Sequence, residues 1–279
     1  MKVGADIEAF VVDSASNYPL SAIGMLGGTK ESPVDIGNGF AVQEDNVTCE
    51  WNVPPASSPD EFIDIIRRGK IVVEEYVRSR YSEQVHLLYQ DSMTFPTFLL
   101  DNPTARRFGC VPELDAYSRG AAFPSPDAAT TNARFAGFHI HFGFGPGEFN
   151  LPGFAAAPLL EALILHRSAY GRQLLSGLSD SAFTRKQFYG RAGAYRDTRY
   201  PNGDIGIEFR VLGSEVGDQL ELLREVIGAV WDDFARLCRD EELSASLYHK
   251  LNLAQVQARR RVHANTDTII KHLGKKVAR

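Results

Sequence analysis

Apolar and polar residues alternate along several stretches of the chain, which is the pattern of strands with one buried face. The alternation is regular after residue 204, where apolar residues from Ile205 to Phe209 are separated by Gly206 and Glu208. Because each strand alternates in this way, we expect an antiparallel sheet rather than a parallel one. Strands are predicted over residues 1–13, 41–53, 85–89, 134–144 and 205–212.

Helical spacing appears between and after these strands. Ser58-Pro59-Asp60-Glu61 is a capping box with proline at the first helical position, and it predicts a helix that ends near Ser79. A stripe of apolar residues from Val216 to Phe234 predicts the strongest helix of the chain. Another helix is predicted from about 155 to 176, one or two more towards the C-terminus, and turns or loops over 14–40, 90–133 and 177–204.

These elements predict an α+β fold, with helices packed on the outer face of an antiparallel sheet. The 279 residues are compatible with one catalytic domain spanning 1–279, to which helices over about 240–279 are an appendage. Trp231 and Phe234 are expected in its core. The composition, 44% apolar and 23% charged, excludes a disordered or fibrous chain.

Net charge and cysteine content exclude several classes of protein. A net charge of -5 argues against nucleic acid as a partner. The three cysteines are far apart in the sequence, which excludes a disulfide framework and a zinc ribbon. There is no long apolar run for a membrane span and no signal-peptide pattern at the start, so we expect a cytoplasmic protein.

Four predicted strands carry acidic, imidazole or guanidinium groups at positions of equal parity. Side chains two positions apart share a face of a strand. The pairs are Asp6 with Glu8, Glu44 with Glu50, His139 with His141, and Glu208 with Arg210. The residues between them are mostly apolar and should face the core. Five carboxylates on one face would repel one another unless cations neutralise them, and oxygen ligands favour Mg²⁺ or Mn²⁺.

Each pair also has a simpler interpretation: a solvated strand face, a structural histidine pair or a cross-strand ion pair. Their combination favours a shared metal site for phosphoryl chemistry on a nucleotide. Residues 185–196 contain four cations, two glycines and two tyrosines, as expected of a loop that closes over phosphates. Gly27-Gly28-Thr29-Lys30 lacks the Walker pattern, so Lys30 is kept only as a ligand contact. Cys49 has the opposite parity to Glu50 and should be buried and inert.

The ordered set of motifs resembles the phage-type carboxylate–amine ligases (amidoligases) of the glutamine synthetase and glutamate–cysteine ligase superfamily. The resemblance runs from about residue 3 to 214. It rests on residues 4–8, 27–30, 43–47, 50–52, 137–143, 189–196 and 208–210. It implies a glutamine-synthetase-like catalytic domain whose curved antiparallel sheet holds ATP and Mg²⁺ or Mn²⁺. A substrate carboxylate would be activated as an acyl phosphate and then joined to an amine.

The resemblance also implies roles for individual residues. The metal ligands would be Asp6, Glu8, Glu50 with Glu44 as a second candidate, His139 and Glu208. The nucleotide contacts would be His141, Lys186, Arg191, Arg196, Arg210 and Lys30, and the catalytic residues Arg210, Arg191 and Glu208. The substrates would be small-molecule or peptide carboxylates and amines.

Two departures from glutamine synthetase stand out. The first acidic pair is Asp-x-Glu rather than two glutamates, and Gly206 replaces an arginine that contacts nucleotide. The first motif starts at residue 4, so we expect no counterpart of the small amino-terminal domain of glutamine synthetase and no such ring, although a homo-oligomer is compatible with the sequence. Two alternatives stay open: a non-catalytic binding or virion-associated protein on the same fold, and a cupin-like metal enzyme around His139 and His141.

Overall fold

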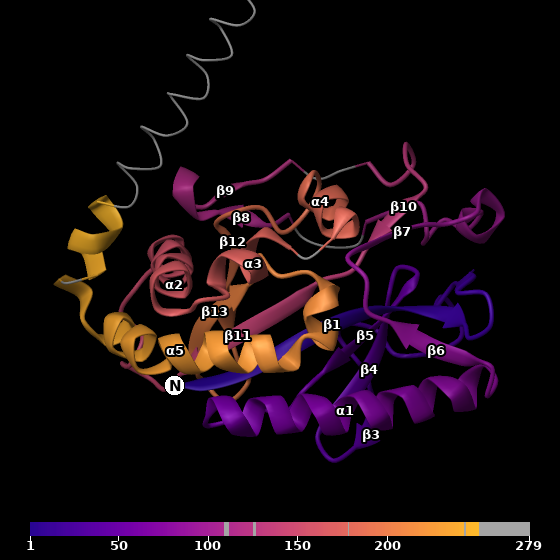
Figure 1. The fold of residues 1–279 in the computed structure, drawn as a ribbon, viewed down its shortest axis with the longest axis horizontal. Helices are drawn as coiled ribbons and strands as arrows, with labels where there is room; N and C mark the ends of the chain where they lie inside the picture. Colours follow the sequence, from indigo (N-terminus) through magenta and orange to yellow (C-terminus); the bar gives the residue numbers. More distant parts are fainter. Residues whose placement is uncertain (109–111, 125–126, 178, 243, 251–279) are drawn as a thin grey trace, which may run out of the picture.

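The centre of the molecule is an antiparallel sheet (Figure 1). The computed structural model describes residues 1–108, 112–124, 127–177, 179–242 and 244–250. Within these residues the sheet has 11 strands, and every pair in it is antiparallel. The architecture is therefore α+β with a large antiparallel sheet, as the strand patterns predict.

The longest strand, β1 (Lys2–Asp13), lies in the middle of the sheet. On one side of it follow β5 (Thr48–Asn52), β4 (Phe40–Asp45) and β3 (Val34–Gly37). On the other side follow β11 (Phe138–Phe144), β13 (Ile205–Phe209), β12 (Ala194–Arg199), β8 (Leu114–Asp115) and β9 (Ala121–Ala122). The far end of β1 pairs with β2 (Pro19–Leu20) and β6 (Val85–Leu88). A separate pair is formed by β7 (Ser92–Thr94) and β10 (Ala133–Phe135).

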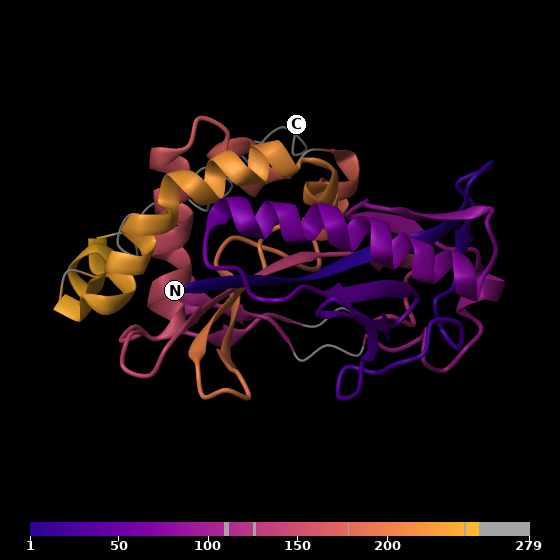
Figure 2. The ribbon, with the colours of Figure 1, turned by 90° about the horizontal axis from the view of Figure 1, so that it is seen from below.

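The two longest helices, α1 (Pro59–Arg80) and α5 (Leu220–Arg239), lie side by side on one face of the sheet (Figure 2). The remaining helices are α2 (Gly153–Arg167), α3 (Gly171–Ser176), α4 (Asp180–Lys186), η1 (Thr97–Leu100), η2 (Ala116–Ser118) and η3 (Ser214–Asp218). None of the helices in the described part of the chain combines the length and the apolar character that a membrane span requires.

The start of α1 confirms the predicted cap. The Ser58 side chain accepts a hydrogen bond from the Glu61 backbone N–H, and Pro59 takes the first helical position. The Glu61 carboxylate accepts from the Ser57 backbone N–H at 2.7 Å. A cap of this kind stabilises a helix by about 1 kcal/mol.

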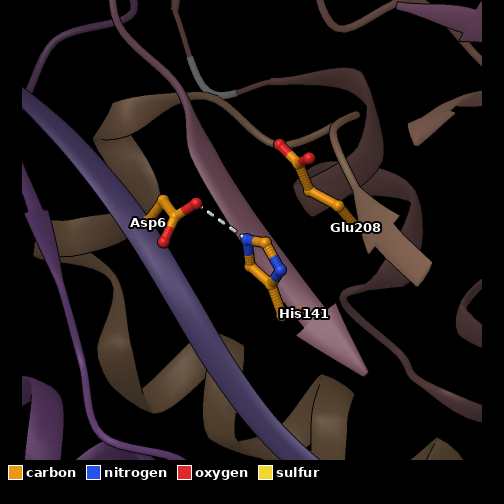
Figure 3. A group of neighbouring side chains, drawn as sticks. All are labelled: Asp6, His141 and Glu208. Atoms are coloured by element: carbon orange, nitrogen blue, oxygen red, sulfur yellow. Dashed lines mark hydrogen bonds and ion pairs between the residues drawn. The ribbon is translucent and has the colours of Figure 1, made fainter. Parts of the chain in front are cut away.

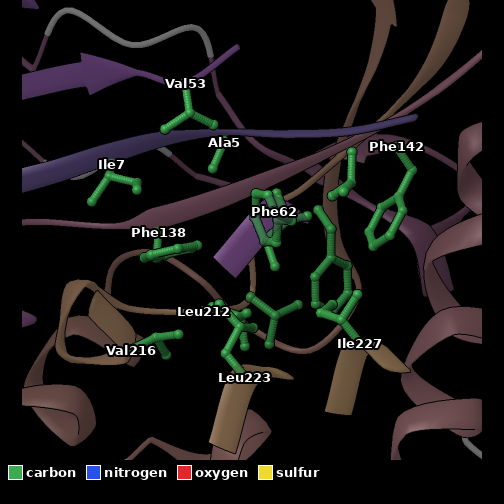
Figure 4. Close-up of a cluster of buried hydrophobic side chains, with 14 of the residues drawn as sticks. Ala5, Ile7, Val53, Phe62, Phe138, Phe142, Leu212, Val216, Leu223 and Ile227 are labelled. Carbon is green, nitrogen blue, oxygen red and sulfur yellow. The ribbon is translucent and has the colours of Figure 1, made fainter. Parts of the chain in front are cut away.

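Apolar side chains from the sheet and from the two long helices form the main core (Figure 4). Ile7 and Phe138 face Leu223 and Ile227 of α5, and all four are buried. Each such side chain stabilises the fold by about 1.5 to 3 kcal/mol relative to an exposed one. Because side chains alternate along a strand, this core leaves the polar positions of the same strands on the opposite face.

Several predicted boundaries are wrong. Residues 41–53 form the hairpin β4–β5 rather than one strand, and residues 134–144 form two strands, β10 and β11. The helix predicted over 155–176 is interrupted between α2 and α3. The segments expected to be irregular contain short elements: β2 and β3, then η1, β8, η2 and β9, then α4 and β12. The strands among these elements form by pairing with other strands, which a pattern within one segment does not report, and the helices among them are at most seven residues long.

The last described residues pack on the rest of the molecule. Tyr248 lies against Phe154 with ring centroids 5.6 Å apart, and its hydroxyl donates to the Ala116 carbonyl. Trp231 is partly buried against the core and Phe234 is fully buried in it. The predicted C-terminal helices beyond residue 250 lie outside the described residues.

Candidate active site

The strand register brings the predicted polar residues onto one face of the sheet. Asp6 on β1 pairs with His139 on β11, and Gly4 pairs with His141. His141 in turn pairs with Glu208 on β13. Residues paired directly across antiparallel strands share a face, so the acids and imidazoles of β1, β11 and β13 meet.

A first group consists of Asp6, His141 and Glu208, which point towards one another from β1, β11 and β13 (Figure 3). One ligand atom from each lies within 4.8 Å of the others. His141 Nε2 is 2.9 Å from Asp6 Oδ2, and the Asn52 amide donates to Asp6 Oδ1 at 2.6 Å. The Tyr200 hydroxyl lies 3.2 Å from His141 Nδ1.

The electrostatics of this first group favour charged forms. Burial by itself would raise the pKa of Asp6, but the adjacent His141 and the Asn52 amide outweigh it and lower that pKa to about 2. Burial opposes the charged form of His141, whose pKa is nevertheless raised by Asp6. Burial is likewise outweighed at Glu208, where Arg210 and His141 lower the pKa. This group therefore carries ionised carboxylates at neutral pH.

A second group consists of Glu8, Asp45 and Glu50, again with one oxygen from each within 4.8 Å of the others. The Gly137 backbone N–H donates to Glu8 Oε2 at 2.6 Å. Burial and then the charge of Asp45 raise the pKa of Glu8 to about 8, and the same two causes raise the pKa of Glu50 well above its ordinary value. Three carboxyl groups this close are a strong ligand set for a divalent cation, which would favour their ionised forms.

His139 and Arg210 connect the two groups. His139 Nδ1 lies 3.9 Å from Glu8 Oε1 and 3.7 Å from Glu208 Oε1. Arg210 Nη1 lies 3.1 Å from His139 Nδ1 and donates to Glu208. Burial and the charge of Arg210 hold the pKa of His139 well below its usual range, so the imidazole is neutral. A neutral imidazole can ligate a metal ion.

The structure corrects the placement of Glu44. The β4–β5 hairpin pairs Gln43 with Glu50 and Glu44 with Cys49, so Glu44 and Glu50 lie on opposite faces of the sheet. The Glu44 carboxylate accepts hydrogen bonds from three backbone N–H groups of residues 24–27 at 2.8 to 3.0 Å. The expectation of a shared face treated residues 41–53 as one strand, whereas the hairpin reverses the chain and pairs even-numbered residues with odd-numbered ones.

Gln43 and Asp45 lie on the same face of the sheet as Glu50, where Glu44 was expected. Sequence reasoning missed Asp45, although Asp45-Asn46 is a turn signal that could have located the hairpin. Asn46 does adopt a left-handed conformation there, with φ of 55°. Cys49 is buried in the core as expected. His141, for which a nucleotide contact was predicted, belongs to the first group, and the predicted metal ligand His139 lies between the two groups.

The predicted basic residues do not all lie close to the two acid groups. Arg196 Nη1 lies 3.7 Å from Glu208 Oε1. Lys186 donates to the carbonyls of Gly190 and Val211. Lys30 lies exposed in a turn, from which its charge contributes to the low pKa of Asp6.

Arg191 and Arg185 lie differently from what the sequence suggested. The Arg191 guanidinium lies 5.0 Å from the ring centroid of Phe123 and donates to the Gln187 carbonyl, and it lines neither of the two cavities described next. Arg185 is only 2% exposed, and its Nη1 has no hydrogen-bond partner among the described residues. No role was predicted for Arg185 by itself, because periodicity does not show which cation of a basic stretch is buried.

Two cavities adjoin the acid groups. A small one of about 40 Å³ adjoins the second group and is lined by Glu8, Asp45, His139, Arg185 and Arg210, with aromatic rings around it. A larger one of about 360 Å³ adjoins the first group. It is lined by Asp6, His141 and Tyr200, by backbone of β1 and by apolar residues such as Val53 and Pro55.

Comparison with known proteins finds structural likeness alone. No family model matches the sequence, and no curated protein matches it. The fold resembles a bifunctional glutathione synthetase from Pasteurella multocida at 13% identity and a TM-score of 0.40, over 90% of this chain and 40% of that one. It also resembles a chain from the complex between the prokaryotic ubiquitin-like protein Pup and its ligase PafA, at 12% identity and a TM-score of 0.37. There the match covers 86% of this chain and 51% of the other.

The chain thus matches about half of the length of these two structures or less.

Proposed function

We propose that the protein is an ATP-dependent carboxylate–amine ligase of the glutamine-synthetase-like type. The observation that carries the proposal is the pair of acid groups on one sheet face, connected through His139 and Arg210. Buried acids at this density need cations, and oxygen ligands facing arginines suit phosphoryl transfer from a nucleotide.

The residues present fit divalent metal ions. Asp6, His141 and Glu208 would hold one ion, and Glu8, Asp45 and Glu50 another. The donors are carboxylate oxygens with one imidazole, which are typical ligands of Mg²⁺ and Mn²⁺. Such ions, when bound, neutralise phosphate oxygens and polarise the phosphorus that is attacked.

The larger cavity is suited to the nucleotide. Its volume of about 360 Å³ lies within the range of small-molecule sites, and its walls are mostly apolar. It adjoins the first group, so a ligand with its base in this cavity could direct phosphates towards Asp6, His141 and Glu208. Arg210 and Arg196, which contact Glu208, would then face the transferring phosphoryl group.

The smaller cavity is suited to the carboxylate substrate. At about 40 Å³ it is much smaller than the cavity assigned to the nucleotide and therefore suits a small group. A planar carboxylate has three heavy atoms, whereas a phosphate has five. The unpartnered Nη1 of Arg185 supplies a buried donor for this anion.

The proposed reaction has two steps. A carboxylate oxygen attacks the γ-phosphorus of ATP and ADP leaves, which produces an acyl phosphate. The amine nitrogen then attacks the acyl carbon, loses a proton and displaces inorganic phosphate, which leaves an amide. Arg210 would stabilise negative charge on the phosphoryl oxygens, an effect worth several kcal/mol when the donor is held in place beforehand.

Two alternatives have less support. A cupin-like enzyme needs a closed barrel, but the sheet of the described residues is open, with β3 and β9 at its edges. A non-catalytic binding protein would not need two complete acid groups beside buried arginines. The amine and the carboxylate of the proposed reaction are open to screening.

The test is calorimetric titration of a non-hydrolysable ATP analogue with Mn²⁺ or Mg²⁺. We expect metal-dependent binding by the wild type, its loss in Glu208→Ala, and its retention in Glu44→Gln, whose carboxylate lies on the other face of the sheet. Binding should be followed by a screen of carboxylate–amine pairs for release of ADP and phosphate. A folded wild type that binds no nucleotide would refute the proposal.

A further inference from the structure

A further buried carboxylate, which belongs to neither acid group, contacts Arg210. Glu113, which precedes β8, is only 2% exposed. Its Oε1 accepts a hydrogen bond from Arg210 Nε at 3.1 Å, and its Oε2 accepts one from the Gly190 backbone N–H at 2.9 Å. Both oxygens are therefore engaged, and neither acid group includes this residue.

Arg210 is held between carboxylates on two sides. Its Nε faces Glu113, while its Nη1 faces Glu208 and His139. The side chain is 3% exposed, and a guanidinium at that depth is strongly destabilising when it has no carboxylate partner. Glu208 is also a proposed metal ligand, so a bound ion and phosphate would compete with Arg210 for its oxygens. Glu113 has no such competitor.

The second contact of Glu113 reaches a further buried arginine, Arg185, through the backbone of Gly190. Gly190 has a φ of 63° and lies so close to Arg185 that a β-carbon there would overlap the Arg185 guanidinium. By holding the Gly190 N–H, Glu113 fixes the backbone against which Arg185 packs. Glu113 thus contacts Arg210 directly and Arg185 through Gly190, and both arginines line the small cavity.

We propose that Glu113 is a positioning residue, which keeps Arg210 aimed at the transferring phosphoryl group when Glu208 ligates metal. The proposal rests on the ligase function proposed above. Glu113 would act through Arg210 rather than on the substrate itself.

The chain contains a matched control in Glu161. This buried carboxylate accepts from the Gly193 N–H at 2.6 Å and from the Tyr117 hydroxyl at 2.6 Å. It thus holds the other end of the same loop without contacting Arg210. A glutamine at 161 can still accept from Gly193 and donate to Tyr117. The two donors at Glu113 approach different oxygens, so a glutamine held in the same place turns its NH₂ group towards one of them and loses that hydrogen bond.

The experiment compares Glu113→Gln with Glu161→Gln in the metal-free protein and in the complex with Mn²⁺ and the ATP analogue. In the metal-free protein, NMR would follow exchange of the Arg210 Nε–H with solvent, assigned with Arg210→Lys. We expect exchange to accelerate about tenfold or more in Glu113→Gln and to stay at the wild-type rate in Glu161→Gln. Calorimetry should show analogue binding weakened about tenfold in Glu113→Gln alone.

Equal behaviour of the two variants in either measurement would overturn the proposal. If Glu113→Gln does not fold, Glu113→Asp keeps the charge with a shorter arm, and the same comparison applies to it. If the wild type binds no nucleotide, the ligase function fails and the positioning role fails with it, whereas the exchange rates still decide separately whether Glu113 holds Arg210.

Discussion

Glu8 gives the sharpest test of the buried acid groups. Burial and the charge of Asp45 raise its pKa from 4.5 to about 8 in the metal-free protein. Between these two pH values the folded protein holds a proton that the unfolded chain has released. The contribution of Glu8 to the free energy of unfolding should therefore be greatest below pH 4.5 and should decrease as the pH rises towards 8.

The expected size follows from the shift. One pKa unit corresponds to about 1.4 kcal/mol, and the pKa of Glu8 is raised from 4.5 to about 8. Raising the pH from below 4.5 to above 8 should therefore lower the free energy of unfolding by about 4 to 5 kcal/mol. Glu8→Gln cannot ionise, and its carbonyl oxygen can still accept the hydrogen bond from Gly137. The variant should therefore gain about 4 kcal/mol relative to the wild type between pH 4.5 and 8.

The assay is urea unfolding at several pH values in the presence of a chelator, with the fluorescence of the buried Trp51 as the signal. Glu75→Gln, on an exposed position of α1, is the control and should follow the wild type within about 0.5 kcal/mol. A difference between Glu8→Gln and wild type that stays constant with pH would show that Glu8 is not protonated in the folded protein, and the reasoning about the second acid group would be wrong.

Two further predictions separate neighbouring positions. Asp45→Asn should reduce the thermal stabilisation by Mn²⁺, because it removes a ligand of the second acid group and leaves the first intact, whereas Glu44→Gln should retain all of it; equal melting shifts in both would contradict the assignment. Gly69→Ala in α1 should destabilise by about 1 to 3 kcal/mol, because its β-carbon would overlap the Trp51 ring. Gly228→Ala in α5 has open space and should stabilise by about 0.5 to 1 kcal/mol; denaturant unfolding that ranks the two alike would refute this.

Where a pattern is local, the sequence predicted it well. The Ser58 cap and the extent of α1 need no information beyond neighbouring residues, and both are confirmed. The shared faces of Asp6 with Glu8 and of His139 with His141 follow from strand parity alone. Each of these pairs lies within one uninterrupted strand, so its geometry is set by the backbone of that strand.

The prediction that Glu44 and Glu50 share a face was wrong because a turn lies between them. Glu44 and Glu50 lie on the two arms of a hairpin, and the pairing across it depends on the turn at Asn46. The same limit hid Asp45, which entered the site only through that register. The long segment 90–133 likewise showed no pattern, yet Phe108 and Glu113 from it line the small cavity and hold Arg210.

The sequence by itself determined that the molecule is an α+β protein with acids and imidazoles on one face of its strands, because alternation of polarity fixes what each strand buries. Only the tertiary structure shows which of these acids and imidazoles lie next to one another. The register of β1, β11 and β13 brings Asp6, His141 and Glu208 together. The register of β4 with β5 places Asp45 beside Glu50 and turns Glu44 to the other face. The folded chain also places Arg185, and not Arg191, in the wall of the small cavity. Those outcomes depend on pairing between residues far apart in the chain, which no local pattern encodes.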